Sequence, residues 1–212
     1  MTNFPNPETL SLIDPINPLL NQPSKEVNLD EINSDFIQGV IDRMLELSAG
    51  KGHSAEDSRQ MVGLAAAQLG ILKSIITLDR AADGSNKEQN LAVIINPLIT
   101  DSSYDVMPGR EGCWSCGNIC GNVERAKEVT LEGLDRTGAP IKLDLKDFVA
   151  RIAQHETDHL LGIRFPDRIP IDHPERLHLV DPAVFDEYRK KWENWPVLCP
   201  REDWESMKAG VV

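Results

Sequence analysis

Long apolar runs and targeting signals are both missing from this sequence of 212 residues. No stretch approaches the ~20 consecutive apolar residues that a membrane-spanning helix requires, so we expect no membrane partner. The first basic residue is Lys25. Secretory signals begin with a basic segment followed by an apolar one, and organelle transit peptides are rich in arginine. We therefore expect a cytoplasmic protein.

Positive charge is also scarce. The chain has 22 Lys and Arg against 34 Asp and Glu, which gives a net charge of −12 at pH 7. Such a surface repels the phosphates of nucleic acids unless its basic residues form a separate patch. The longest basic run, Arg189–Lys191, comes just after the acidic pair Asp186 and Glu187. Direct binding to nucleic acid is therefore not expected.

Cysteine is rare but unevenly placed. Of the four cysteines, three lie within eight residues, at Cys113, Cys116 and Cys120. Crowded cysteines in a chain without a secretory signal indicate metal or redox chemistry more often than disulfide bonds. Read as iron–sulfur ligands, these three lack a nearby fourth cysteine.

Three helices are expected from apolar spacing and capping residues. The first begins after Ser34, a good N-cap residue, and ends at Gly50. The second runs from about Asp147 to Leu161 and is followed by Gly162, the residue type that commonly ends a helix. The third begins after Asp181, with proline at its first position.

Runs of β-branched residues predict at least four strands between the first two helices. They are Ser74–Leu78, Leu91–Asn96, Glu128–Leu134 and Pro140–Leu145. This order predicts an α+β fold in which antiparallel sheets pack around the second helix. We expect residues 1–212 to form one domain, with an extended N-terminal arm (about 1–32) and a C-terminal helix plus extension (about 181–212).

The second predicted helix contains the pattern H-E-x-x-H. His155 and His159 are four residues apart, so they share one face of a helix and can bind the same cation. Glu156 lies next to them and can act as a general base without being a ligand. A third protein ligand is still needed. The upstream segment Glu111–Ser115 offers Cys113, a soft thiolate suited to iron, zinc or cobalt beside imidazole.

Three segments together resemble the motifs of peptide deformylases. Val62–Gln68 is similar to the family pattern G-x-G-L-A-A-x-Q, Glu111–Ser115 to E-G-C-L-S, and Gln154–Leu160 to Q-H-E-x-D-H-L. Their order and spacing also agree with the family, from about Leu29 to Ile169. The resemblance implies one divalent ion bound by Cys113, His155 and His159. It implies Fe(II) in the cell, with zinc, nickel or cobalt in purified protein.

The resemblance also implies roles for further residues. Glu156 would carry a proton, while the side chain of Gln68 and the backbone N–H of Trp114 would stabilise an oxyanion. Gly63 would allow the substrate backbone to approach closely. We expect the pocket for methionine to be lined by Val62, Phe148 and Ile152. Glu111 and Arg125 are expected to pair and support the cysteine loop.

The function that these residues imply is removal of the N-formyl group from the N-terminal methionine of new polypeptides, with release of formate. Two alternatives remain: a hydrolase of the same fold acting on another formamide or acyl-amide, or a metal-binding relative without activity. The segment from Ala183 to Val212 has five basic and six acidic residues. Such a tail is not a basic docking tail, so any transient proximity to the ribosome would not depend on it.

Overall fold

The computed structural model describes residues 5–52, 59–83 and 88–211. Helix α1 (Asp35–Ser48) begins where the sequence indicates, because the side chain of Ser34 accepts a hydrogen bond from the backbone N–H of Ile37. Gly50 follows its end with a positive φ of 72°. The inner face of α1, which includes Val40 and Met44, is fully buried. This face joins a hydrophobic core beneath β1 and β2.

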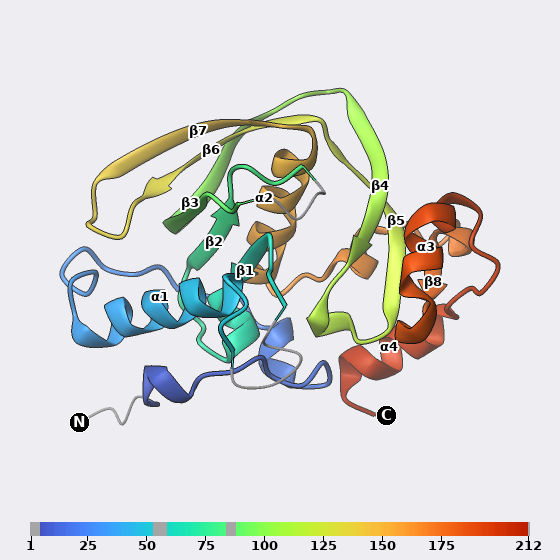
Figure 1. The fold of residues 1–212 in the computed structure, drawn as a ribbon, viewed down its shortest axis with the longest axis horizontal. Coiled ribbons are helices and arrows are strands. Elements are labelled where there is room, and N and C mark those ends of the chain that lie inside the picture. Colours follow the sequence, from blue (N-terminus) through green and yellow to red (C-terminus); the bar gives the residue numbers. More distant parts are fainter. Residues whose placement is uncertain (1–4, 53–58, 84–87, 212) are drawn as a thin grey trace.

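The larger sheet has five strands in the order β1-β2-β3-β6-β7, and every neighbouring pair is antiparallel. Its strands are β1 (Gly63–Ala65), β2 (Ile75–Asp79), β3 (Leu91–Ser102), β6 (Glu128–Leu134) and β7 (Pro140–Lys146). The last two form the expected hairpin, in which Gly138 takes a positive φ of 87°. In Figure 1 these two strands curve together over α2.

A second antiparallel sheet contains β4 (Val106–Gly112), β5 (Ile119–Ala126) and β8 (Leu177–Leu179). These strands and the short β1 are not among those expected from sequence. Pro108 and Gly109 in β4 and Gly121 in β5 interrupt the β-branched pattern that marks a strand. Both glycines lie in close contacts: a Cβ at Gly109 would lie 2.6 Å from the guanidinium of Arg151, and one at Gly121 would lie 2.6 Å from Ile169.

Helix α2 (Asp147–Leu160) lies near the centre of the molecule, between the two sheets (Figure 1). Ala150, Ile152 and Ala153 pack against apolar residues of the larger sheet. On the other side, Arg151 reaches the backbone of β4 and β5. The helix ends one residue earlier than expected, and Gly162 follows it with a φ of 71°. The fold is α+β with antiparallel sheets, as predicted.

The two terminal segments pack against the body and against each other. The N-terminal segment contains two short 3-10 helices, η1 (Pro7–Thr9) and η2 (Pro18–Asn21). The C-terminal segment contains η7 (Pro182–Val184), α3 (Phe185–Lys191), η8 (Trp192–Asn194) and α4 (Arg201–Ala209). Asp181 caps the start of this segment, but the first turn is a 3-10 helix. Asn21 donates a hydrogen bond to the backbone of Lys208 at 2.8 Å.

Trp204 of α4 and Tyr188 of α3 are both fully buried. Among the described residues, no helix is both long enough and apolar enough to cross a membrane.

Candidate metal centre

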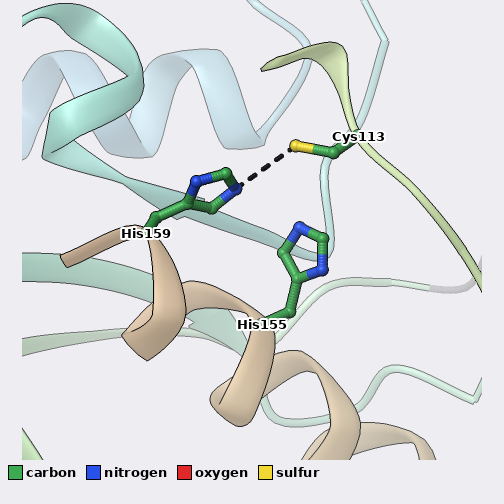
Figure 2. Close-up of side chains that lie close together, drawn as sticks. All are labelled: Cys113, His155 and His159. Atoms are coloured by element: carbon green, nitrogen blue, oxygen red, sulfur yellow. Dashed lines mark hydrogen bonds between the residues drawn. The ribbon is translucent and has the colours of Figure 1, made fainter. Parts of the chain in front are cut away.

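Three possible metal ligands meet between α2 and the loop that follows β4. Cys113 lies at the start of the 3-10 helix η4 (Trp114–Cys116), and His155 and His159 are on α2. Figure 2 shows both imidazoles on the side of α2 that faces the cysteine. The Sγ of Cys113 lies 3.3 Å from Nε2 of His159, and one ligand atom from each of the three residues lies within 4.8 Å of the others.

The other two crowded cysteines are not part of this cluster. Within the described residues, the group close enough to share an ion contains Cys113 alone of the cysteines. The hydrogen bond from Cys116 lowers the pKa of Cys113 well below its usual value and outweighs the effect of burial. Burial raises the pKa of Cys116, and it raises that of Cys120 to about 12. The thiolate that a metal needs is therefore favoured at Cys113, and the geometry does not support an iron–sulfur cluster.

Glu111 orients the first histidine. Its Oε2 lies 2.9 Å from Nδ1 of His155, which leaves the other ring nitrogen free to face the cysteine. Glu111 also pairs with Arg125 through two hydrogen bonds of 2.9 Å and with Arg151 at 2.8 Å. Burial raises the pKa of Glu111, but the hydrogen bonds from His155 and Arg125 outweigh it and lower that pKa. A carboxylate behind a ligand histidine fixes both its tautomer and its orientation.

Arg125 connects this carboxylate to a second one. It pairs with both Glu111 and Asp158, and Asp158 also binds Arg168. The pKa of Arg125 is raised, because its bonds to these carboxylates outweigh the effect of burial. Buried charges are tolerated only when they are paired in this way.

The side-chain amide of Gln68 points its nitrogen toward the cluster. Its Oε1 accepts a hydrogen bond from the backbone N–H of Ala65 at 2.9 Å, which fixes the orientation of the amide. Its Nε2 then faces Cys113 Sγ at 3.3 Å and Ser115 Oγ at 3.2 Å. Gln68 is only 4% exposed, so a donor held here would be largely shielded from water.

Glu156 lies beside the cluster and is 4% exposed. Burial raises the pKa of this carboxyl to about 7. Its Oε2 and the Nδ1 of His159 have no hydrogen-bond partner within the described part of the chain. A Cβ at Gly63 would lie 2.6 Å from Oε1 of Glu156, so the absence of a side chain there makes room for this carboxylate.

A pocket of about 340 Å³ opens onto these groups. It is lined by all four residues expected to contact substrate, namely Val62, Gly63, Phe148 and Ile152. Trp114 lines it as well. Sequence reasoning did not identify Arg110, Phe185 or Arg189, which also line it. Phe185 and Arg189 lie on α3, far from the three motifs. No sequence pattern indicates that such single residues line a pocket.

Arg164 is another residue that sequence reasoning missed. It is 1% exposed and donates hydrogen bonds to the carbonyl oxygens of Ser115 at 2.7 Å and Pro15 at 2.8 Å. Its guanidinium also lies 4.4 Å from the ring centre of Trp204. One buried side chain thus joins the loop after Cys113 to both terminal segments.

One thiolate and two imidazoles are a donor set suited to a single divalent transition metal. The unpartnered oxygen of Glu156 and the open pocket beside it leave room for water and substrate. Such an arrangement defines a metal-dependent hydrolase.

Comparisons with known proteins identify the family. The sequence matches the family model of polypeptide deformylases over residues 11–175. A peptide deformylase of Thermodesulfovibrio yellowstonii is 39% identical over 145 residues, which cover 68% of this chain and 81% of the relative. The chloroplastic peptide deformylase 1A of Solanum lycopersicum is 37% identical over 164 residues, which cover 72% of this chain and 56% of the relative.

A solved structure shares the fold. The Met-Ala-Ser-bound class I type b peptide deformylase of Acinetobacter baumannii superposes with a TM-score of 0.65 at 32% identity, covering 76% of this chain and 98% of that one. This chain therefore belongs to the polypeptide deformylase family, whose members are metal-dependent hydrolases that remove the N-formyl group from nascent peptides.

Proposed function

We propose that this chain hydrolyses the formyl group of N-formylmethionyl peptides at a single metal ion held by Cys113, His155 and His159. The observation that carries the proposal is the close approach of these three ligand atoms beside a buried carboxylate with an unpartnered oxygen. Thiolate and imidazole ligands suit Fe(II), the ion that we propose for the cell. They also bind zinc, nickel or cobalt, which would replace iron in protein purified in air.

A divalent ion bound here supplies Lewis-acid chemistry, because it makes a water molecule more acidic and polarises a carbonyl oxygen. Glu156 would accept the proton of the attacking water on Oε2, its unpartnered oxygen. The same carboxyl would then return that proton to the nitrogen of the leaving peptide, so that formate and a free amino terminus result. Gly63 would assist by leaving space for the carboxylate to stay beside the site.

The oxyanion that develops on the formyl oxygen needs donors. Gln68 would supply its Nε2, which is already turned toward the cluster by the bond from Ala65 to its oxygen. The backbone N–H of Trp114, the residue after Cys113, would supply the second. Such donors matter because they are in place before charge develops, and losing one typically costs about 2.7–4 kcal/mol of transition-state stabilisation.

The apolar part of the pocket would bind the methionine side chain. Ile152 is 4% exposed and Phe148 is half-buried, and both present apolar surface to the pocket. Val62 is 39% exposed and forms the outer edge. A flexible thioether side chain fits irregular apolar surfaces of this kind.

The proposal is tested by measuring formate release. The protein would be reconstituted anaerobically with Fe(II) and given formyl-Met-Ala-Ser, with acetyl-Met-Ala-Ser as the control substrate. We expect turnover of the formyl peptide only. Equal turnover of both peptides would instead indicate a general acyl-amide hydrolase, and turnover of neither would contradict the proposal.

The role of Glu156 is tested separately. Glu156→Gln keeps the size and polarity of the side chain but removes the base, so we expect stoichiometric metal with activity lowered by at least ~100-fold. Glu132→Gln, on the exposed face of β6, is the matched control and should retain activity. Loss of metal from Glu156→Gln, or a rate close to that of the control, would contradict the proposed role.

We also propose that residues 1–212 act as one catalytic domain and that delivery to the ribosome does not depend on the C-terminal segment. Trp204 of that segment is fully buried, so α4 is held against the body rather than left free for docking. Salt-sensitive co-sedimentation with ribosomes that disappears when residues after Asp181 are removed from a still folded protein would contradict this.

A further inference from the structure

We propose that the rim of the pocket selects formylated peptides that carry an acidic side chain within the first few residues after methionine, through Arg110 and Arg189. The inference rests on the proposed deformylase function and specifies its substrates. Both arginines line the same pocket as Cys113 and Glu156. With the formyl group at the metal centre and methionine in the apolar part, the following residues of the peptide must pass the remaining walls.

Helix α3 supplies one of these walls. Phe185 and Arg189 are four residues apart, so they lie on one face of the helix, and both line the pocket. The adjacent face is anchored by Tyr188, which is fully buried and hydrogen-bonded to His178 at 3.0 Å. The ring of Tyr188 also packs edge-on against Trp195 at 5.2 Å. Arg189 is therefore presented from a fixed helix rather than from a free tail.

Strand β4 supplies the second cation. Successive side chains of a strand point to opposite faces, so Glu111 turns into the core while Arg110 turns toward α3. The guanidinium of Arg110 lies 5.5 Å from the ring centre of Phe185. This contact places Arg110 over an aromatic ring of α3, the helix that carries Arg189. Burial lowers the pKa of Arg110, and the nearby positive charge of Arg189 lowers it further.

Among the described residues, these two arginines lack the carboxylate partner that other arginines of this region have. Arg151, which also lines the pocket, is neutralised by Glu111 at 2.8 Å. Within residues 5–52, 59–83 and 88–211, no carboxylate forms an ion pair with Arg110 or Arg189. Glu187 of α3 is occupied by Lys191 at 2.8 Å.

Two neighbouring cations at the mouth of a pocket, with no carboxylate partner in the described part of the chain, are unusual in a protein with a net charge of −12. A carboxylate is the group that would satisfy both, because guanidinium and carboxylate form short, charge-assisted hydrogen bonds. The molecules that must enter this pocket are peptides, so an Asp or Glu side chain of the substrate is the anion that the rim would meet.

The test compares matched substrates. Starting from formyl-Met-Ala-Ser-Ala, each of positions two, three and four would be changed in turn to Asp or Asn, which differ in charge but hardly in size. We expect kcat/KM to favour Asp over Asn by about 3- to 10-fold at one position or more, mainly through KM, as for a partly exposed charge pair. The preference should shrink in about 0.5 M NaCl, because salt screens exposed charges.

Variants connect the preference to the two residues. In a protein with both Arg110→Gln and Arg189→Gln, the ratio of Asp to Asn substrates should approach one. Lys190→Gln removes the same charge from the neighbouring position of α3, where the side chain is exposed and does not line the pocket, and should keep the wild-type ratio. The Kd values of the corresponding deformylated peptides, with Asp or Asn at position two, three or four of Met-Ala-Ser-Ala, give a second reading that needs no turnover.

The outcomes separate this inference from the proposed function. Turnover of neutral formyl peptides with an Asp-to-Asn ratio near one at all three positions would overturn the inference and leave the function intact. A ratio that survives in the double variant would overturn it as well. If no formyl peptide is hydrolysed, the proposed function fails, and equal Kd values for the Asp and Asn forms of the deformylated peptides at all three positions would then overturn the inference too.

Discussion

Replacing Glu111 by Gln is a sharp test of how the metal centre is supported. The side chain of Glu111 is 4% exposed and holds Arg125, Arg151 and His155 at the same time. The substitution keeps the shape but removes the negative charge, so two buried guanidinium groups lose a counter-charge. Removing one partner of a buried ion pair typically destabilises a protein by about 3–5 kcal/mol, because the remaining charge stays buried. Arg125 keeps Asp158, which places our expectation near the lower end of that range.

The same change should weaken metal binding. His155 would lose the carboxylate that orients its ring, and loss of such a partner typically lowers metal affinity by about 10- to 100-fold. Unfolding would be followed in urea by circular dichroism on the metal-free protein, and metal affinity by competition with a chelator. The two measurements separate folding from ligand orientation.

Glu132→Gln is the matched control for this experiment. Glu132 also pairs with a cation, Lys142 at 2.9 Å, but both side chains are exposed. Solvent screens such pairs, so the control should unfold close to wild type and keep its metal. If Glu111→Gln lost no more stability than the control and kept wild-type metal affinity, the supporting role assigned to Glu111 would be wrong.

Three further predictions follow from the structure. Cys113→Ala should abolish metal binding while Cys116→Ser retains it, and X-ray absorption of the loaded protein should show one sulfur ligand; two or more would revive the iron–sulfur interpretation. Trp204→Ala empties a fully buried site and should lower the free energy of unfolding by about 3–5 kcal/mol in urea, whereas a loss below about 1 kcal/mol would show that α4 is not part of the core. Burial lowers the pKa of His178 below its usual value of 6.5, so the unfolded chain binds a proton at this residue more readily than the folded protein does. The free energy of unfolding should therefore be highest above about pH 6.5 and fall as the pH drops below that value. The urea midpoint of unfolding would be measured from pH 7.5 to 5.5, and it should change less with pH in His178→Gln than in wild type. An equal pH dependence in both proteins would contradict this.

Local patterns explain which elements could be predicted from sequence. Ser34 and Gly50 bound α1 as expected, and Gly162 follows α2, because caps act within one turn. The strands rich in β-branched residues were also found, including both partners of the β6–β7 hairpin. The two histidines of α2 were found because a spacing of four residues places them on one face of a helix, and Glu156 was found because it directly follows the first of them.

Long-range packing explains what was missed. Strand β4 contains Pro108 and Gly109, which disfavour a strand locally, yet pairing with β5 and the close approach of Arg151 stabilise it there. Arg164 and Arg189 take part in the site only because distant segments bring them to it. A single sequence holds no pattern for such contacts, since the partners of Arg164 lie 49 and 149 residues away along the chain.

The packing around the loop after Cys113 has a consequence for the order of events during synthesis. Cys116, in that loop, shares a hydrophobic cluster with Trp204, against which Cys113 and Met207 also pack. A nascent chain that has emerged only as far as α2 would already contain the three proposed ligands but not α4, whose Trp204 and Met207 pack around the loop that carries Cys113. Contacts between such distant segments form late, because closing a long loop costs chain entropy. If the proposed ligands bind metal, we therefore expect loading to follow the docking of α4 on this loop, so that a chain in which α4 has not yet docked would bind metal more weakly.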